Sequence, residues 1–105
     1  MKQIVAIIKP FLAEKVIRAI GTLPVDELMV REVKGYGRQK NYLSKYEDNE
    51  FSIAYLPKVE ITVWVDDALV EPLVELIQEN SRTGRMGDGK ILVLPTVSSN
   101  TGTNI

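Results

Sequence analysis

The 105-residue sequence predicts one α+β domain with the element order β-α-β-β-α-β, in which two helices cover one face of an antiparallel four-stranded sheet. Three observations lead to this fold class. Four short segments are apolar in alternation or throughout, as strands are. Two longer segments carry apolar residues at helical spacing. Each half of the chain reads strand, helix, strand, which is the split pattern of ferredoxin-like folds.

The first half of the chain supplies a strand, a helix and a second strand. Residues 3–9 (QIVAIIK) are apolar on both alternating faces, so we expect a strand that is buried on both sides. Pro10 suits the first turn of a helix, and 21–24 (GTLP) stops it. This helix has apolar residues at Leu12, Val16, Ala19 and Ile20. The second strand is expected at about 27–35.

The second half repeats the order. Residues 59–65 (VEITVWV) alternate Val and Ile with Glu60, Thr62 and Trp64, which predicts a strand. Asp66 and Asp67 offer an N-cap and an acidic first turn to a helix. Pro72 conflicts with that helix, because it should remove a hydrogen bond and bend it. We expect the helix that follows Asp67 to bury a stripe of Leu69, Val70, Leu73, Val74 and Ile77. Residues 90–94 (KILVL) are expected to form the last strand.

The sheet should have more apolar surface than two helices can cover. The first and last strands are apolar on both faces, and Trp64 points away from the valines of its own strand. The simplest cover for the second face of the sheet is another copy of the same chain. The sequence therefore predicts an obligate oligomer.

The single predicted domain spans residues 1–105, and two of its segments do not belong to the layers of sheet and helices. Residues 38–57, between the second and third strands, far exceed the usual hairpin loop of about 2–5 residues. A connection of this length is functional or disordered, so we expect a long mobile loop. Residues 96–105 form a polar tail that we also expect to be mobile.

The composition excludes several classes of site. The chain has no cysteine and no histidine, which removes disulfides, thiolate catalysis and the commonest general base and transition-metal ligand. Its net charge of -1 gives no basic field for nucleic acid. No apolar run approaches the roughly 18 residues of a membrane span, and no cleavage site follows the N-terminal segment. A cytoplasmic location is the default expectation.

The segment TGRMGDGK (83–90) holds three glycines and two cations where a helix gives way to a strand. Its GxxxxGK spacing is that of a P-loop, but a P-loop joins a strand to a following helix and ends in Ser or Thr, whereas Ile91 follows here. Two interpretations stay open. The glycines let backbone N–H groups converge on an anion, or they cap the helix and make a tight turn. The same two interpretations apply to the segment KGYGRQK (34–40).

Taken together, KGYGRQK (34–40), LPKVEI (56–61) and TGRMGDGKI (83–91) resemble the P-II nitrogen-regulatory signal-transduction family in residue type, spacing and order, over nearly the whole chain up to about Pro95. The resemblance implies a homotrimer of β-α-β-β-α-β subunits. It implies that an adenine nucleotide (ADP, AMP or ATP) binds in clefts between subunits. The long connection, called the T-loop in that family, would reach a membrane transporter or a regulated enzyme.

The resemblance also implies roles for particular residues. Gln39 and Lys58 match the residues used for 2-oxoglutarate, with a magnesium ion at Gln39 bridging it to ATP, and bicarbonate is an alternative effector. On the loop, Lys40, Tyr42, Tyr46 and Phe51 would meet the partner. The residues implied for the nucleotide are Met29, Gly35, Gly37, Arg38, Gln39, Trp64, Gly87, Asp88, Gly89 and Lys90.

The chain departs from the family pattern at several positions. Phe51 stands where many bacterial members carry a tyrosine that is uridylylated, and it has no hydroxyl to modify. Asn49 stands where some members carry a phosphorylatable serine. Thr101 and Thr103 replace arginines that grip the phosphates from the neighbouring subunit, so we expect weak discrimination in favour of ATP.

Three classes of function compete. The first is a non-enzymatic sensor, in which the bound nucleotide sets the conformation of the loop. The second is a slow nucleotide phosphohydrolase, with Lys90 and Arg38 stabilising charge and Asp88 or a metal positioning water. The third is an RNA-binding module of the same element order, which would need stacking aromatic residues in a pattern that the sequence lacks. The sensor is the preferred hypothesis.

Overall fold

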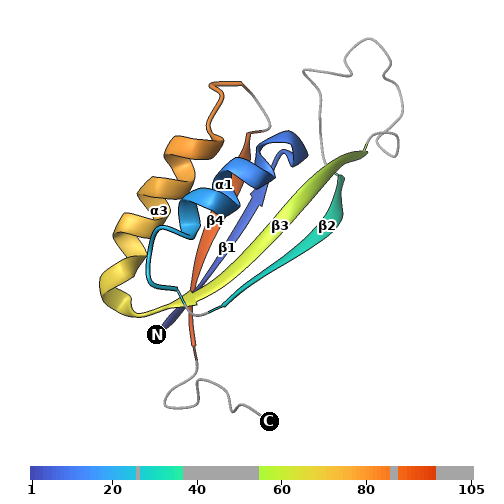
Figure 1. Cartoon of the computed structure of the whole chain (residues 1–105). Coiled ribbons are helices and arrows are strands. Elements are labelled where there is room, and N and C mark those ends of the chain that lie inside the picture. Colours follow the sequence, from blue (N-terminus) through green and yellow to red (C-terminus); the bar gives the residue numbers. More distant parts are fainter. Residues whose placement is uncertain (26, 37–54, 86–87, 97–105) are drawn as a thin grey trace.

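The computed structural model describes residues 1–25, 27–36, 55–85 and 88–96. Its four strands form one antiparallel sheet in the order β2-β3-β1-β4, and both helices lie on the same face (Figure 1). The predicted fold class is confirmed. The elements are β1 (Lys2–Ile8), the 3-10 helix η1 (Pro10–Leu12), α1 (Ala13–Ile20), β2 (Leu28–Tyr36), β3 (Tyr55–Val65), α3 (Asp67–Ser81) and β4 (Gly89–Pro95).

The core lies between the two helices and the sheet. Alternate residues of the two central strands point to the helices, and strand pairing sets Ile4 opposite Val63 and Ala6 opposite Ile61. From the helices, Val16, Ile20, Leu73 and Ile77 are fully buried against them. The alternation in 59–65 therefore predicted correctly which residues of this strand form the core.

Both helices start and stop much as their sequences indicate. Pro10 opens the helical region, although its turn is a 3-10 helix that leads into α1. Gly21 follows α1 and donates its N–H to the carbonyl of Ile17. Asp66 occupies the N-cap position of α3, but its side chain makes no capping hydrogen bond. The helix α3 continues through Pro72 to Ser81.

The carboxylate of Asp67 lies near two cations that the sequence did not indicate as its partners. One oxygen lies 3.2 Å from the N-terminal ammonium of Met1, and the other lies 3.6 Å from the Lys2 ammonium. A hydrogen bond to that N-terminal ammonium and the charge of Lys2 lower the pKa of this carboxyl group. The start of α3 is thus tied to the start of β1.

The strand β3 begins earlier than predicted. Leu56 and Pro57 pair with Gly35 and Lys34 of β2, so the prediction that the long loop extends to residue 57 is wrong. Because β1 ends opposite Val59, residues 55–58 of β3 have no described strand beside them on that edge. A proline can sit at such an edge, since no strand there needs its missing N–H. The segment between β2 and β3 (37–54) and the tail (97–105) lie outside the described residues.

The face of the sheet that points away from the helices has no cover within the described chain. We call it the open face. Its apolar members include Met29, Leu56, Leu92 and Leu94, all of which are exposed. No helix among the described residues is long and apolar enough to cross a membrane. By strand register, the open face comprises Gln3, Val5, Ile7, Met29, Arg31, Val33, Gly35, Leu56, Lys58, Glu60, Thr62, Trp64, Lys90, Leu92 and Leu94.

Candidate functional site

Most of the described candidate residues gather at one end of the sheet. There β1 and β2 end while β3 and β4 begin, so Gly35, Lys58, Gly89 and Lys90 lie at the same end although they are far apart in sequence. The chain leaves β2 at Tyr36 and returns at the paired Tyr55, also at this end (Figure 1). We call this region the upper end of the sheet. The segments KGYGRQK, LPKVEI and TGRMGDGKI all reach it.

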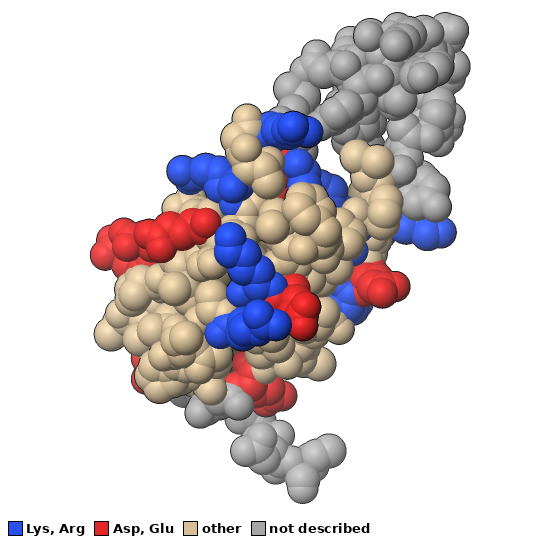
Figure 2. All heavy atoms as spheres, turned by 45° about the horizontal axis from the view of Figure 1, so that its top comes forward, with Lys and Arg blue, Asp and Glu red and all other residues tan. Residues whose placement is uncertain are grey.

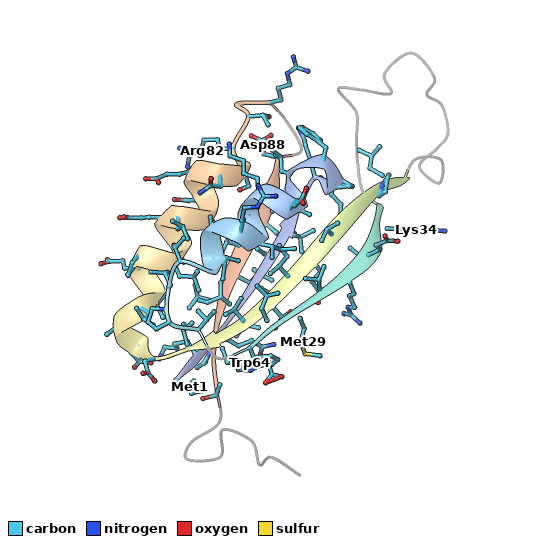
Figure 3. The ribbon with its side chains drawn as sticks, viewed as in Figure 1. Met1, Met29, Lys34, Trp64, Arg82 and Asp88 are labelled. Atoms are coloured by element: carbon cyan, nitrogen blue, oxygen red, sulfur yellow. The ribbon has the colours of Figure 1, made fainter. Side chains whose placement is uncertain are left out.

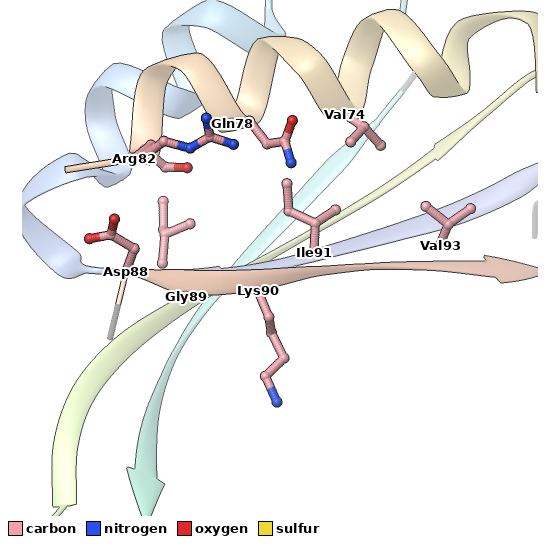
Figure 4. A pocket seen from close by; sticks show the side chains of 10 residues that line it. Val74, Gln78, Arg82, Asp88, Gly89, Lys90, Ile91 and Val93 are labelled. Atoms are coloured by element: carbon pink, nitrogen blue, oxygen red, sulfur yellow. The ribbon is translucent and has the colours of Figure 1, made fainter. Parts of the chain in front are cut away.

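Two lysines project from the upper end onto the open face. Lys90 is exposed, and its side chain points away from α3 (Figure 4). Lys58 alternates with the buried Val59 and so lies on the same face. Partial burial lowers the pKa of Lys58, and the positive charge of Lys9 lowers it further, while Asp88 opposes the shift. An anion bound here would therefore be favoured by the charge of more than one lysine.

The carboxylate of Asp88 organises the segment that follows α3. It accepts hydrogen bonds from the backbone N–H of Thr83 at 2.8 Å and of Gly84 at 2.9 Å. The Thr83 hydroxyl also donates to it, and the Lys9 ammonium lies 3.0 Å away. These donors lower the pKa of Asp88, the Thr83 hydroxyl most of all. The backbone does converge on an anion here, as the glycine pattern suggested, but for Thr83 and Gly84 that anion is the chain's own carboxylate.

The glycines at this end have different reasons to be glycine. Gly89 has a φ of +128°, and a Cβ there would lie 2.0 Å from the carbonyl oxygen of Ile7, so the fold itself requires it. Gly84 has a φ of +83° with open space around it. A Cβ on Gly35 would make ordinary contact, 3.6 Å from the side chain of Lys58. Nothing within the described chain therefore demands a glycine at position 35.

A hollow of about 260 Å³ opens on the other side of the upper end, between α3 and β4. Gln78 approaches it from α3, Arg82 from the position that follows this helix, and Ile91 and Val93 from the strand (Figure 4). Lys90 borders this hollow only at its base, because the side chain points to the opposite face. The hollow is therefore separate from the lysines of the open face.

Met29 and Trp64, the residues implied for the adenine wall, lie together but away from the upper end. They line a hollow of about 240 Å³ on the open face, next to Thr62 and the ion pair of Arg31 with Glu60, whose nearest atoms are 3.2 Å apart. Figure 3 shows Met29 and Trp64 at one end of the sheet and Arg82 and Asp88 at the other. Within one chain, the structure does not bring the two groups together.

Several predicted residues lie outside the described part of the chain. Among the described residues, no group of three or more carboxylates could hold a metal ion. On the face that Figure 2 shows, the Lys and Arg side chains are scattered, with Asp and Glu among them, and do not form one basic field. The undescribed predicted residues are Gly37, Arg38, Gln39, Lys40, Tyr42, Tyr46, Phe51 and Gly87.

Sequence reasoning missed Lys9 and Thr83. Lys9 directly follows β1, and its ammonium pairs with Asp88. By the alternation of side chains along a strand, Lys9 falls on the same side as Val5 and Ile7. This alternation and the proline that follows could have indicated a lysine on the open face at a strand end. Its partner could not have been inferred, because that depends on the register of β1 with β4.

Comparison with known proteins identifies the family. The family model described as "Nitrogen regulatory protein P-II" matches residues 1–100. The nitrogen regulatory protein P-II of Azospirillum brasilense is 46% identical over 95 residues, covering 90% of this chain and 85% of its own length. The nitrogen regulatory protein GlnK of Escherichia coli K12 is 41% identical over 93 residues, covering 89% of this chain and 83% of its own. The chain therefore belongs to the P-II nitrogen regulatory protein family.

Proposed function

We propose that this protein is a non-enzymatic signalling protein that senses an adenine nucleotide, ADP, AMP or ATP, in the clefts between the subunits of a homotrimer. One observation carries the proposal. Lys58 and Lys90, from two separate strands, project onto the open face at the upper end of the sheet, beside a glycine at position 35 that packing among the described residues does not require. Such an arrangement suits a phosphate group, because cations face it and the nearby backbone has no side chain in the way.

The open face supports the intersubunit part of the proposal. Its exposed apolar residues would be covered by further copies of the chain, and closed assemblies of identical chains are the common solution. Met29 and Trp64 lie apart from Lys90 within a single chain. A cleft between two chains can bring an adenine wall from one chain next to the lysines of another. We therefore assign the complete site to the assembly.

Signalling requires that the bound nucleotide be coupled to a partner. The long segment between β2 and β3 leaves and rejoins the sheet next to Lys58 and Gly35. A ligand there needs only about 1–3 kcal/mol of differential affinity for two conformations of that segment to act as a switch. A small carboxylate or bicarbonate at Lys58 would be a second input, with magnesium where ATP is the nucleotide. The regulated partner would be a transporter or an enzyme.

Replacing Lys90 with alanine should weaken ADP binding roughly ten- to hundredfold, because a charge-assisted hydrogen bond is worth about 1.5–3 kcal/mol. The fold should be retained, since the side chain is exposed. Lys15→Ala is the matched control, because it removes an exposed lysine from α1 on the opposite side of the sheet. Calorimetric titration of the two variants and the wild type measures the difference.

Equal affinity in Lys90→Ala and the wild type would remove Lys90 from the site. The same titrations with ATP and AMP test the consequence of the tail, where Thr101 and Thr103 carry no charge. We expect ADP or AMP to bind as well as ATP or better. Steady release of phosphate from ATP during the experiment would contradict the non-enzymatic part of the proposal.

A further inference from the structure

Asp88 connects two parts of the chain that are far apart in sequence. It lies just before β4, where it accepts hydrogen bonds from the segment after α3 and pairs with Lys9 at the end of β1. The side chains of Lys9 and Asp88 are only 20% and 23% exposed, so water screens this pair less than it would a pair on the open surface. The pair thus joins the 83–85 segment to β1 beside Lys58.

The contacts of Asp88 do not suit a phosphate ligand. A carboxylate repels a phosphate, and Asp88 already has two backbone N–H groups, a hydroxyl and an ammonium directed at it. The Arg85 N–H donates to the Thr83 hydroxyl oxygen at 3.2 Å, which extends the same network by one residue. These hydrogen bonds therefore join residues of the segment to one another, and the Asp88 carboxylate is not directed at a ligand.

We propose that Asp88 is a positioning residue, whose carboxylate fixes the backbone of Thr83 and Gly84 and, through Lys9, holds residues 83–85 against β1 so that Lys90 meets its ligand in one fixed geometry. The carboxylate of Asp88 itself does not touch the nucleotide. The positioning role stands without a ligand, and only its effect on nucleotide affinity rests on the proposed function. Lys9 takes part in the same positioning role, because its ammonium also lies 3.4 Å from the Thr83 hydroxyl oxygen.

Amide hydrogen exchange of the nucleotide-free protein tests the positioning role directly. In Asp88→Asn, the amides of Thr83 and Gly84 should exchange at least about tenfold faster than in the wild type, because their charged acceptor is gone. Lys9→Gln should accelerate both amides to a smaller extent, and Lys9→Arg, which keeps the charge, should restore them. Glu60→Gln is the matched control, since it breaks the ion pair with Arg31 on the open face, and the hydrogen bonds of Glu60 within the described chain go to Arg31 and Thr62 and not to residues 83–85.

Wild-type exchange rates at Thr83 and Gly84 in Asp88→Asn would overturn the proposal. ADP affinity gives a second test whose sign differs between the two roles. If Asp88 faced the phosphates, removing its negative charge would tighten binding. If Asp88 positions the segment, Asp88→Asn should bind ADP about tenfold more weakly. Tighter binding would therefore also overturn the proposal. A wild type that binds no nucleotide would defeat the proposed function, while the exchange measurement would still decide the positioning role.

Discussion

Gly89→Ala is expected to lose about 4 kcal/mol of folding stability or to fail to fold. The added Cβ would lie 2.0 Å from the carbonyl oxygen of Ile7, and the backbone φ of +128° is strained for any residue with a side chain. The clash is with backbone and not with a flexible side chain, so relief would require β4 to separate from β1. Because β4 pairs along its whole length with that central strand, the edge of the sheet would be lost.

Urea unfolding at equal protein concentration measures this loss, with Gly35→Ala as the matched control. A Cβ at position 35 makes only ordinary contact, 3.6 Å from Lys58, and φ there is not positive. The control should therefore change the free energy of unfolding by less than about 1 kcal/mol. Similar stabilities for the two variants would mean that β4 does not approach β1 as closely as the register requires.

Leu92→Asp is expected to convert the proposed trimer into monomers. Leu92 lies on the open face in the row with Val5, Thr62 and Met29, where other copies of the chain would cover it. A carboxylate buried there without a partner would cost several kcal/mol at each interface. Light scattering coupled to gel filtration gives the mass of the assembly.

Val93→Asp is the matched control for this change. Val93 is the next residue of the same edge strand and, like Leu92, is 43% exposed, but it faces the hollow beside α3. This variant should keep the mass of the wild type. A wild type that is already monomeric at micromolar concentration, or loss of the assembly in both variants, would contradict the assignment of the open face to the interface.

Much of the fold could be predicted because alternation and helical spacing act locally. In residues 59–65 the period of two separates Ile61 and Val63, which are buried under the helices, from Glu60, which pairs on the open face. The apolar excess of the open face was also foreseen. The start of β3 was missed because Pro57 and the residues before it do not alternate, and their strand character comes from pairing with β2.

The site was less predictable, since it depends on contacts over long sequence separations. The glycine pattern suggested a backbone that converges on an anion, but could not reveal that Asp88 is that anion for Thr83 and Gly84. Lys9 meets Asp88 only because β1 and β4 pair in one particular register. For Gly89, the resemblance implied a role at the nucleotide but could not show that the fold needs glycine there, where a Cβ would lie 2.0 Å from the carbonyl oxygen of Ile7.

The most direct test of the account is calorimetric titration of ADP into the wild type and into Leu92→Asp under the same conditions. A closed assembly of identical chains repeats one site at every interface, so the wild type should bind about one ADP per chain. The monomeric variant should bind none measurably, since each site would have lost its second subunit. If the wild type binds neither ADP, AMP nor ATP, or if the monomer binds ADP as tightly as the assembly, then the protein is not a nucleotide sensor with sites between its subunits.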